Sequence, residues 1–144
     1  MAETVTLTLE RRIAALPETV FDAWLDREGV GRWLFATPGG VMETVEIDAR
    51  VGGRFRIGER REDELAEHFG EYVDIDRPRR IAFDFWTSFS DERTRITIEI
   101  APDGGGSLLT LTHKGVWKDY GDQTCQGWTM ILEGLERAIA RSQN

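Results

Sequence analysis

The chain has 144 residues, of which 40% are hydrophobic and 31% charged, and its formal net charge is −8. This composition excludes a disordered or membrane-embedded chain and fits one globular domain over residues 1–144. The basic residues are scattered among the more numerous acidic ones, with no concentrated basic face, so we expect no nucleic-acid partner.

The first residues, 1–4, carry no basic flank and no apolar stretch of the secretory type, so we expect a cytoplasmic location. No apolar run reaches the length that a bilayer requires, and we expect no membrane insertion. Cys125 is the only cysteine, which excludes an internal disulfide and zinc-finger chemistry.

Residues 4–10 alternate between apolar and polar side chains, the pattern of a half-buried strand. Pro17 then marks the start of a helix, because its missing N–H costs nothing at the first helical position. Trp24 falls on the apolar face of that helix. A second short helix is predicted over Arg27–Leu34, although two glycines weaken it.

From the loop at residues 36–40 to about residue 116 the apolar pattern has a period of two and predicts about six strands. Ile96, Ile98 and Ile100 give the clearest of these signals, and residues 102–106 form a strong hairpin turn. The mixed basic and acidic stretch that includes Arg61 is interpreted as a solvated hairpin tip.

Near Asp119 the period changes to that of a helix, and an apolar stripe that includes Trp128 and Leu132 continues for about twenty residues. Strands joined by short links pair antiparallel, and the sheet they form must have one face covered. We therefore predict an α+β domain. It has a strongly curved antiparallel sheet of about six to seven strands around a long C-terminal helix, with two short helices after the first strand.

This order of elements, with these residues, resembles the START-related superfamily of helix-grip proteins. Within it, the chain is similar to the branch named for the activator of the heat-shock protein 90 ATPase. The resemblance covers nearly the whole chain. The matching residues are Ile13, Ala14, Pro17, Glu18, Val20, Phe21, Asp22, Ala23, Trp24, Trp33, Val51, Gly52, Gly53, Phe55, Gly70, Pro78, Arg80, Ile81, Trp86, His113, Gly115, Gly127, Trp128, Leu132 and Leu135.

The resemblance implies a helix-grip fold and a gap between helix and sheet. Proteins of this superfamily carry lipids, hormones or polyketides there, and some branches use the gap for catalysis. We therefore expect a non-enzymatic binder of a small apolar molecule. The alternatives are a cyclase- or hydrolase-type enzyme and a module that stimulates a chaperone ATPase; a chaperone partner and a homodimer stay open.

Aromatic and apolar walls with a few polar groups are what a small-molecule pocket needs. His113 is in phase with the inward residues of its strand. It is the polar side chain expected to hydrogen-bond the ligand. The sequence does not separate a lined cavity from a filled core. The expected ligand-binding residues are Phe35, Phe55, Tyr72, Phe85, His113, Trp117, Trp128 and Leu132.

His113 is interpreted either as a satisfied interior histidine or as a general base. In the enzyme alternative, His113 or His68 is the base and Asp84 or Glu71 orients it. The sequence contains no metal-binding string and no phosphate-binding glycine loop, so we expect neither a metal nor a cofactor.

Gly127 and Gly134 lie seven residues apart on one face of the predicted C-terminal helix. Each costs about 1 kcal/mol relative to alanine, so a local reason is expected for both. Either the helix approaches the sheet too closely for a side chain, or the missing side chains leave space for a ligand beside Trp128 and His113. We favour the second explanation.

Overall fold

A computed structural model describes residues 3–142, which fold into seven strands, two α-helices and two single-turn 3-10 helices. The elements in chain order are β1 (Thr4–Ile13), α1 (Pro17–Leu25), η1 (Val30–Arg32), β2 (Val41–Ile47), β3 (Arg54–Arg61), β4 (Glu64–Asp76), β5 (Arg80–Thr87), β6 (Ser90–Asp103), β7 (Gly106–Trp117), η2 (Lys118–Tyr120) and α2 (Gly121–Ser142).

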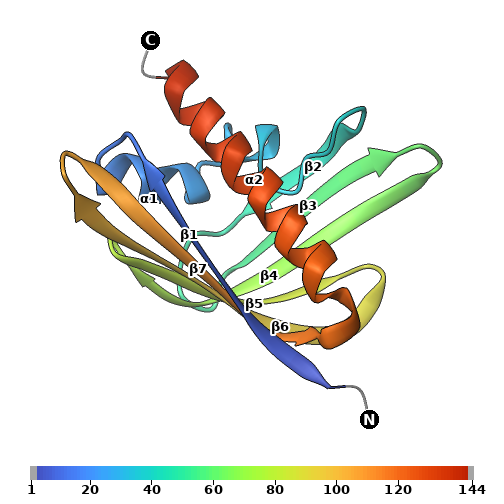
Figure 1. The fold of residues 1–144 in the computed structure, drawn as a ribbon. Helices are drawn as coiled ribbons and strands as arrows, with labels where there is room; N and C mark the ends of the chain where they lie inside the picture. Colours follow the sequence, from blue (N-terminus) through green and yellow to red (C-terminus); the bar gives the residue numbers. More distant parts are fainter. Residues whose placement is uncertain (1–2, 143–144) are drawn as a thin grey trace.

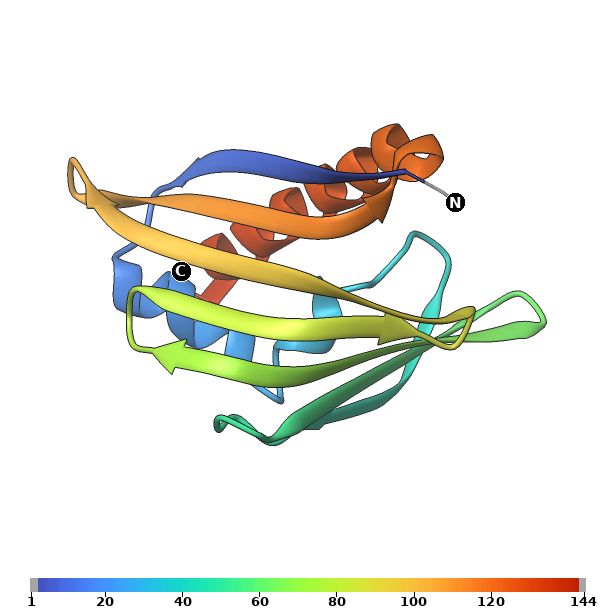
Figure 2. The ribbon, with the colours of Figure 1, turned by 90° about the horizontal axis from the view of Figure 1, so that it is seen from below.

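All seven strands belong to one antiparallel sheet in the order β1-β7-β6-β5-β4-β3-β2. The sheet is strongly curved, and α2 lies diagonally across its concave side, with α1 and η1 covering the rest (Figure 1). The same arrangement is seen from below in Figure 2. The predicted α+β fold, with seven strands around a long C-terminal helix, is confirmed.

The core lies between α2 and the concave face of the sheet. Ile96 and Ile98 on β6, and Leu109 on β7, are fully buried there, as their period-two pattern predicts. Trp128 and Leu132 supply the matching face of α2. Burial of each such side chain contributes about 1.5–3 kcal/mol relative to an exposed one.

Two boundaries differ from the expectation. The predicted helix over Arg27–Leu34 is reduced to the single turn of η1, because Gly29 and Gly31 disfavour a longer helix. The strand that the apolar pattern predicts from about His68 to Asp76 begins earlier, at Glu64, because β4 pairs with β3 as far as Arg61. Among residues 3–142 no helix is both long and apolar enough to span a membrane.

The two glycines of α2 have different surroundings. A Cβ added at Gly134 would lie 3.1 Å from the Cβ of Trp33, whereas one added at Gly127 would meet no atom within 4 Å. Gly134 therefore lies where α2 closely approaches the segment that carries Trp33, and a side chain there would press on Trp33. The expectation that this position leaves space for a ligand is wrong, because Trp33 fills that space.

Leucine at these two positions provides a matched pair of variants. Gly134→Leu should lower the free energy of unfolding by about 1–3 kcal/mol, because the added side chain overpacks against Trp33. Gly127→Leu should keep it or raise it by up to about 1 kcal/mol through better helix propensity. Urea titration of both variants is the test, and equal effects would contradict the packing described for Gly134.

Trp24 on α1 is buried and packs edge-on against Trp33, with ring centroids 4.9 Å apart. Trp24→Ala should therefore destabilise the protein by about 3–5 kcal/mol in a urea titration, as large core truncations do. Glu18→Ala, an exposed change on the same helix, should stay within about 0.5 kcal/mol. A loss below about 1 kcal/mol for Trp24→Ala would show that α1 is only loosely attached.

Candidate functional site

An open cleft of about 420 Å³ lies at one end of the sheet. Three segments surround it: the end of β5 with the β5–β6 turn and the beginning of β6, the end of β7, and the beginning of α2 with η2. Figure 2 shows these segments at the same end of the sheet. Small-molecule pockets of proteins have volumes of roughly 300–1,000 Å³, so the cleft has the size of a ligand site.

Aromatic side chains form the mouth of the cleft. Phe89, Trp117 and Tyr120 line it and are 56%, 38% and 51% exposed, respectively. The rings of Trp117 and Tyr120 stack with centroids 5.9 Å apart. Large apolar side chains exposed together around one hollow are typical of an interaction site rather than of an ordinary surface.

A buried histidine forms the back of the cleft. The indole N–H of Trp128 donates to Nδ1 of His113 at 3.0 Å, and Nε2 of His113 lies 2.8 Å from Oγ1 of Thr94. The Thr94 hydroxyl in turn donates to the backbone carbonyl of Phe85 at 3.4 Å. These contacts form one chain from α2 through β7 and β6 to β5.

The direction of this chain follows from its first member. An indole N–H is only a donor, so Nδ1 must accept, and a neutral His113 carries its proton on Nε2 and donates to Thr94. Burial lowers the pKa of His113 to about 4, which favours the neutral ring. Both nitrogens are therefore in use, and His113 acts as a satisfied interior histidine at the wall of the cleft.

A bulge in β7 positions this wall. Val5 of β1 pairs with Val116 while Thr6 pairs with Lys114, so Gly115 is the extra residue of β7. Gly115 has a φ of 88°, a conformation that glycine adopts without strain. The bulge turns the last residues of β7 toward η2 and brings Trp117 to the mouth of the cleft.

The carboxylates proposed as orienters of a catalytic histidine are engaged elsewhere. Asp84 accepts a hydrogen bond from Arg95 at 2.6 Å, and Glu71 accepts one from Arg54 at 3.1 Å. Among the side chains that the structure describes, neither histidine forms an ion pair with a carboxylate. The structure therefore does not bring together the base and orienter of the enzyme alternative.

His68 lies in the core, away from the cleft mouth. Its ring stacks on Phe35 with centroids 4.2 Å apart and planes 2° from parallel. Burial, followed by the positive charge of Arg61, lowers the pKa of His68 to about 4. Its Nδ1 is buried and has no hydrogen-bond partner.

The eight expected ligand-binding residues fall into two groups. Three of them line the cleft: Phe85, His113 and Trp117. The others pack in the hydrophobic core between α2 and the sheet: Phe35, Phe55, Tyr72, Trp128 and Leu132. In this structure their side chains fill the middle of the helix–sheet gap.

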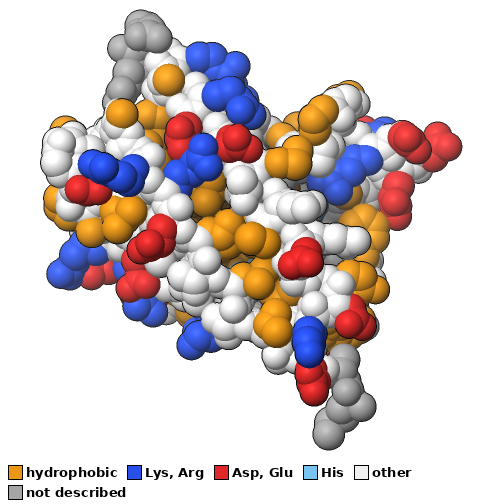
Figure 3. All heavy atoms as spheres, in the orientation of Figure 1, with side chains coloured by type: hydrophobic (Ala, Val, Ile, Leu, Met, Phe, Trp, Pro, Cys, Tyr) orange, Lys and Arg blue, Asp and Glu red, His pale blue; other side chains and the backbone are white. Residues whose placement is uncertain are grey.

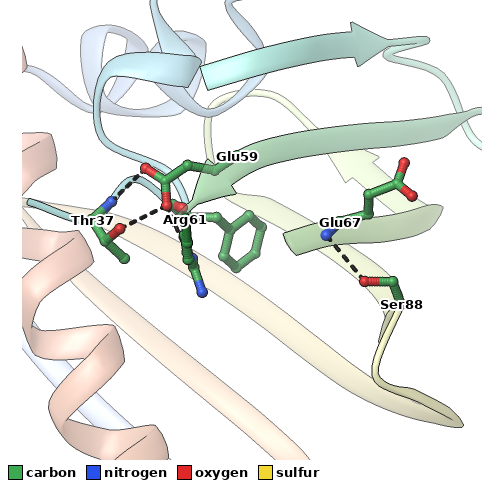
Figure 4. Close-up of polar contacts among 6 residues, drawn as sticks. Thr37, Glu59, Arg61, Glu67 and Ser88 are labelled. Carbon is green, nitrogen blue, oxygen red and sulfur yellow. Dashed lines mark hydrogen bonds and ion pairs between the residues drawn. The ribbon is translucent and has the colours of Figure 1, made fainter. Parts of the chain in front are cut away.

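One polar cluster was missed by the sequence analysis. Glu59 is 1% exposed and accepts hydrogen bonds from Arg61 and from both the backbone N–H and the hydroxyl of Thr37 (Figure 4). Burial raises the pKa of Glu59, but these hydrogen bonds outweigh it and hold the pKa below its usual value. The expected solvated hairpin tip is present at residues 62–64, which are exposed, but Arg61 at its base pairs with a buried carboxylate.

The sequence did contain a signal for this cluster. One period-two pattern continues along β3 through Phe55, Ile57, Glu59 and Arg61, so the carboxylate falls on the inward face.

In the described part of the chain, no group of three or more His, Cys, Asp or Glu side chains is arranged to hold a metal ion.

Comparison with known proteins identifies the family. The family described as "Activator of Hsp90 ATPase homolog 1-like protein" matches residues 14–140. The chain belongs to this family. No curated protein matched the sequence.

Several solved structures have a similar fold. A protein from Chromobacterium violaceum is 27% identical with a TM-score of 0.83, and the match covers 93% of this chain and 96% of that one. A protein of unknown function from Staphylococcus aureus is 17% identical with a TM-score of 0.90, over 99% and 97% of the two chains. An AHSA1-like protein from Aeromonas hydrophila is 22% identical with a TM-score of 0.84, over 96% and 94%. The last two show the fold alone.

The two buried histidines predict how stability depends on pH. Their pKa is about 4 in the folded chain, against about 6.5 when unfolded, so only the unfolded chain takes up these protons between pH 6.5 and 4. Stability is therefore complete above pH 6.5 and falls toward pH 4, by up to about 3 kcal/mol for each histidine.

Urea unfolding of wild type and His113→Gln at pH 7.5 and pH 4.5 measures the share of His113. The difference in stability between the two proteins should be largest at pH 7.5 and should shrink at pH 4.5. A difference that is the same at both pH values would show that the ring is not held neutral in the folded protein.

Proposed function

We propose that this protein binds a small, mainly apolar molecule with an aromatic or flat aliphatic body in the cleft between the β5–β6 turn and the beginning of α2, without catalysis. The observation that carries the proposal is the cleft itself. Its mouth is formed by exposed aromatic side chains, and its back by a buried histidine that is already fully hydrogen-bonded.

The chemistry of the lining favours an apolar ligand. Phe85, Phe89, Trp117 and Tyr120 present ring faces and edges, which attract apolar and aromatic surface without requiring a charge. Ser90, Glu92 and Thr124 supply a few polar groups to the lining, whereas the Thr94 hydroxyl is already engaged by His113 and the Phe85 carbonyl. Such a pocket fixes the orientation of a ligand through a small number of hydrogen bonds and gains affinity from burial.

The hydrogen-bond chain through His113 argues against the enzyme alternative. A general base needs a free lone pair within reach of substrate, and the lone pair of His113 at Nδ1 accepts from Trp128 instead.

The chaperone-stimulating module and the homodimer stay predictions. The absence of nucleic-acid binding also stays a prediction. On the face drawn in Figure 3, acidic and basic side chains are interspersed, which is consistent with the lack of a concentrated basic surface on that face.

Binding of an uncharged fluorescent probe, N-phenyl-1-naphthylamine, tests the proposal. Wild type should bind the probe, and Trp117→Ala or Phe89→Ala should weaken binding about tenfold by removing ring contacts at the mouth of the cleft. Val41→Ala, which truncates an exposed apolar side chain on β2 away from the cleft, is the control and should bind like wild type.

Two results would contradict the proposal. One is the absence of probe binding by the folded wild type at the limit of probe solubility. The other is an equal affinity of wild type, Trp117→Ala and Phe89→Ala, which would place the bound probe outside the cleft.

A further inference from the structure

The ring of Phe35 lies between α2 and the sheet in the way that a bound aromatic ligand would. It stacks on His68 at 4.2 Å, lies 5.2 Å from the ring of Phe85 and 5.8 Å from that of Trp128. Yet Phe35 belongs to the irregular segment between η1 and β2, not to a helix or a strand. The ring is thus carried into the core by a loop.

Besides the packing of its buried side chains, this loop is held by hydrogen bonds of the Glu59 cluster. Phe35 has a φ of 59°, a left-handed conformation that side chains other than glycine rarely adopt. Arg61 donates to the Phe35 carbonyl at 3.2 Å, and Glu59 accepts from the N–H and the hydroxyl of Thr37 at 2.8 and 2.7 Å. A strained loop segment can move as a unit when the hydrogen bonds that hold it are broken and replaced by others.

A buried polar atom beside Phe35 is left without a partner. His68 is 8% exposed, and its Nδ1 has no hydrogen bond while the ring faces that of Phe35. Buried polar atoms of proteins are nearly always hydrogen-bonded, so an unpaired one needs an explanation. The phenyl group of Phe35 offers no hydrogen-bonding group, whereas a ligand ring with a hydroxyl would.

We propose that Phe35 is a displaceable plug over an inner binding site for a small planar aromatic ring that carries a hydroxyl group. The ligand ring takes the place of the Phe35 ring between His68, Phe85 and Trp128. Its hydroxyl pairs with Nδ1 of His68, and because a hydroxyl both donates and accepts, it fits either tautomer of that ring. The inference rests on the proposed function in one respect: Phe85 lines the cleft and touches Phe35, so the ligand enters from the cleft.

Truncation of the plug is the direct experiment. Phe35→Ala should open a space of about one phenyl ring and bind phenol about tenfold more tightly than toluene, measured by calorimetry and by the NMR signals of the His68 ring. The additional change His68→Phe should abolish this preference, because it removes the only hydrogen-bonding group assigned to the hydroxyl. Equal affinity for phenol and toluene in Phe35→Ala would overturn the proposal.

Phe83→Ala is the matched control. It removes the same ring from the same core, but the ring contacts of Phe83 are with Phe55, Tyr72 and Phe85 rather than with His68. Its cavity should therefore show no preference for phenol over toluene. A preference equal to that of Phe35→Ala would also overturn the proposal, because a generic cavity would then explain the binding.

A second variant keeps the Phe35 ring and weakens the hydrogen bonds that hold its loop. It tests the inner site if Phe35→Ala does not fold. Thr37→Val removes one hydrogen bond to Glu59, so the open form becomes more populated and the apparent affinity for phenol should rise several-fold over wild type. An unchanged affinity would show that the loop does not open and would overturn the plug.

The outer cleft is tested separately. Trp117→Ala changes binding of the naphthylamine probe but should leave the phenol preference of Phe35→Ala intact. If the cleft variants do not affect probe binding, the proposed function fails while the phenol experiment still decides the inner site. If only the phenol preference is missing, the inner site fails and the cleft stands.

Discussion

The hydrogen bond from Trp128 to His113 joins the long helix to the sheet at the place where the cleft begins. It constrains both elements, because α2 must hold its indole N–H over β7, and β7 must keep a neutral imidazole facing inward. The continuation to Thr94 and to the Phe85 carbonyl extends the constraint to β6 and β5. A core made only of apolar side chains would pack as tightly, but it would not fix the position of the helix along the sheet in this way.

Phe85 connects the outer cleft with the interior. Its ring is about 6 Å from those of both histidines and 5.2 Å from that of Phe35, and it also lines the cleft. The two histidines on either side differ in one respect. His113 has partners on both nitrogens, whereas His68 has an unpaired Nδ1. The first therefore acts as part of a rigid wall, and the second is the position at which an additional polar contact would be gained.

The fold could be predicted because its elements have strong periodic patterns: Ile96, Ile98 and Ile100 define a strand, and the stripe through Trp128 and Leu132 defines the helix. The inward direction of His113 followed from the same pattern. The site was harder to predict, since an aromatic residue in phase with a core face can pack or line a pocket. Phe35 shows this limit, because its position depends on a left-handed backbone and on the ion pair between the buried Glu59 and the half-buried Arg61. Only the folded structure brings these groups together.

The central claim is that an apolar molecule binds against a neutral, fully hydrogen-bonded His113. Nitrogen NMR of the imidazole signals, recorded with and without N-phenyl-1-naphthylamine, tests it most directly. We expect His113 to remain protonated on Nε2 alone from pH 8 to pH 5.5, and we expect the probe to shift the signals of its ring together with the indole signal of Trp117. A His113 that titrates near pH 6.5, or a probe that binds without moving either signal, would contradict the account.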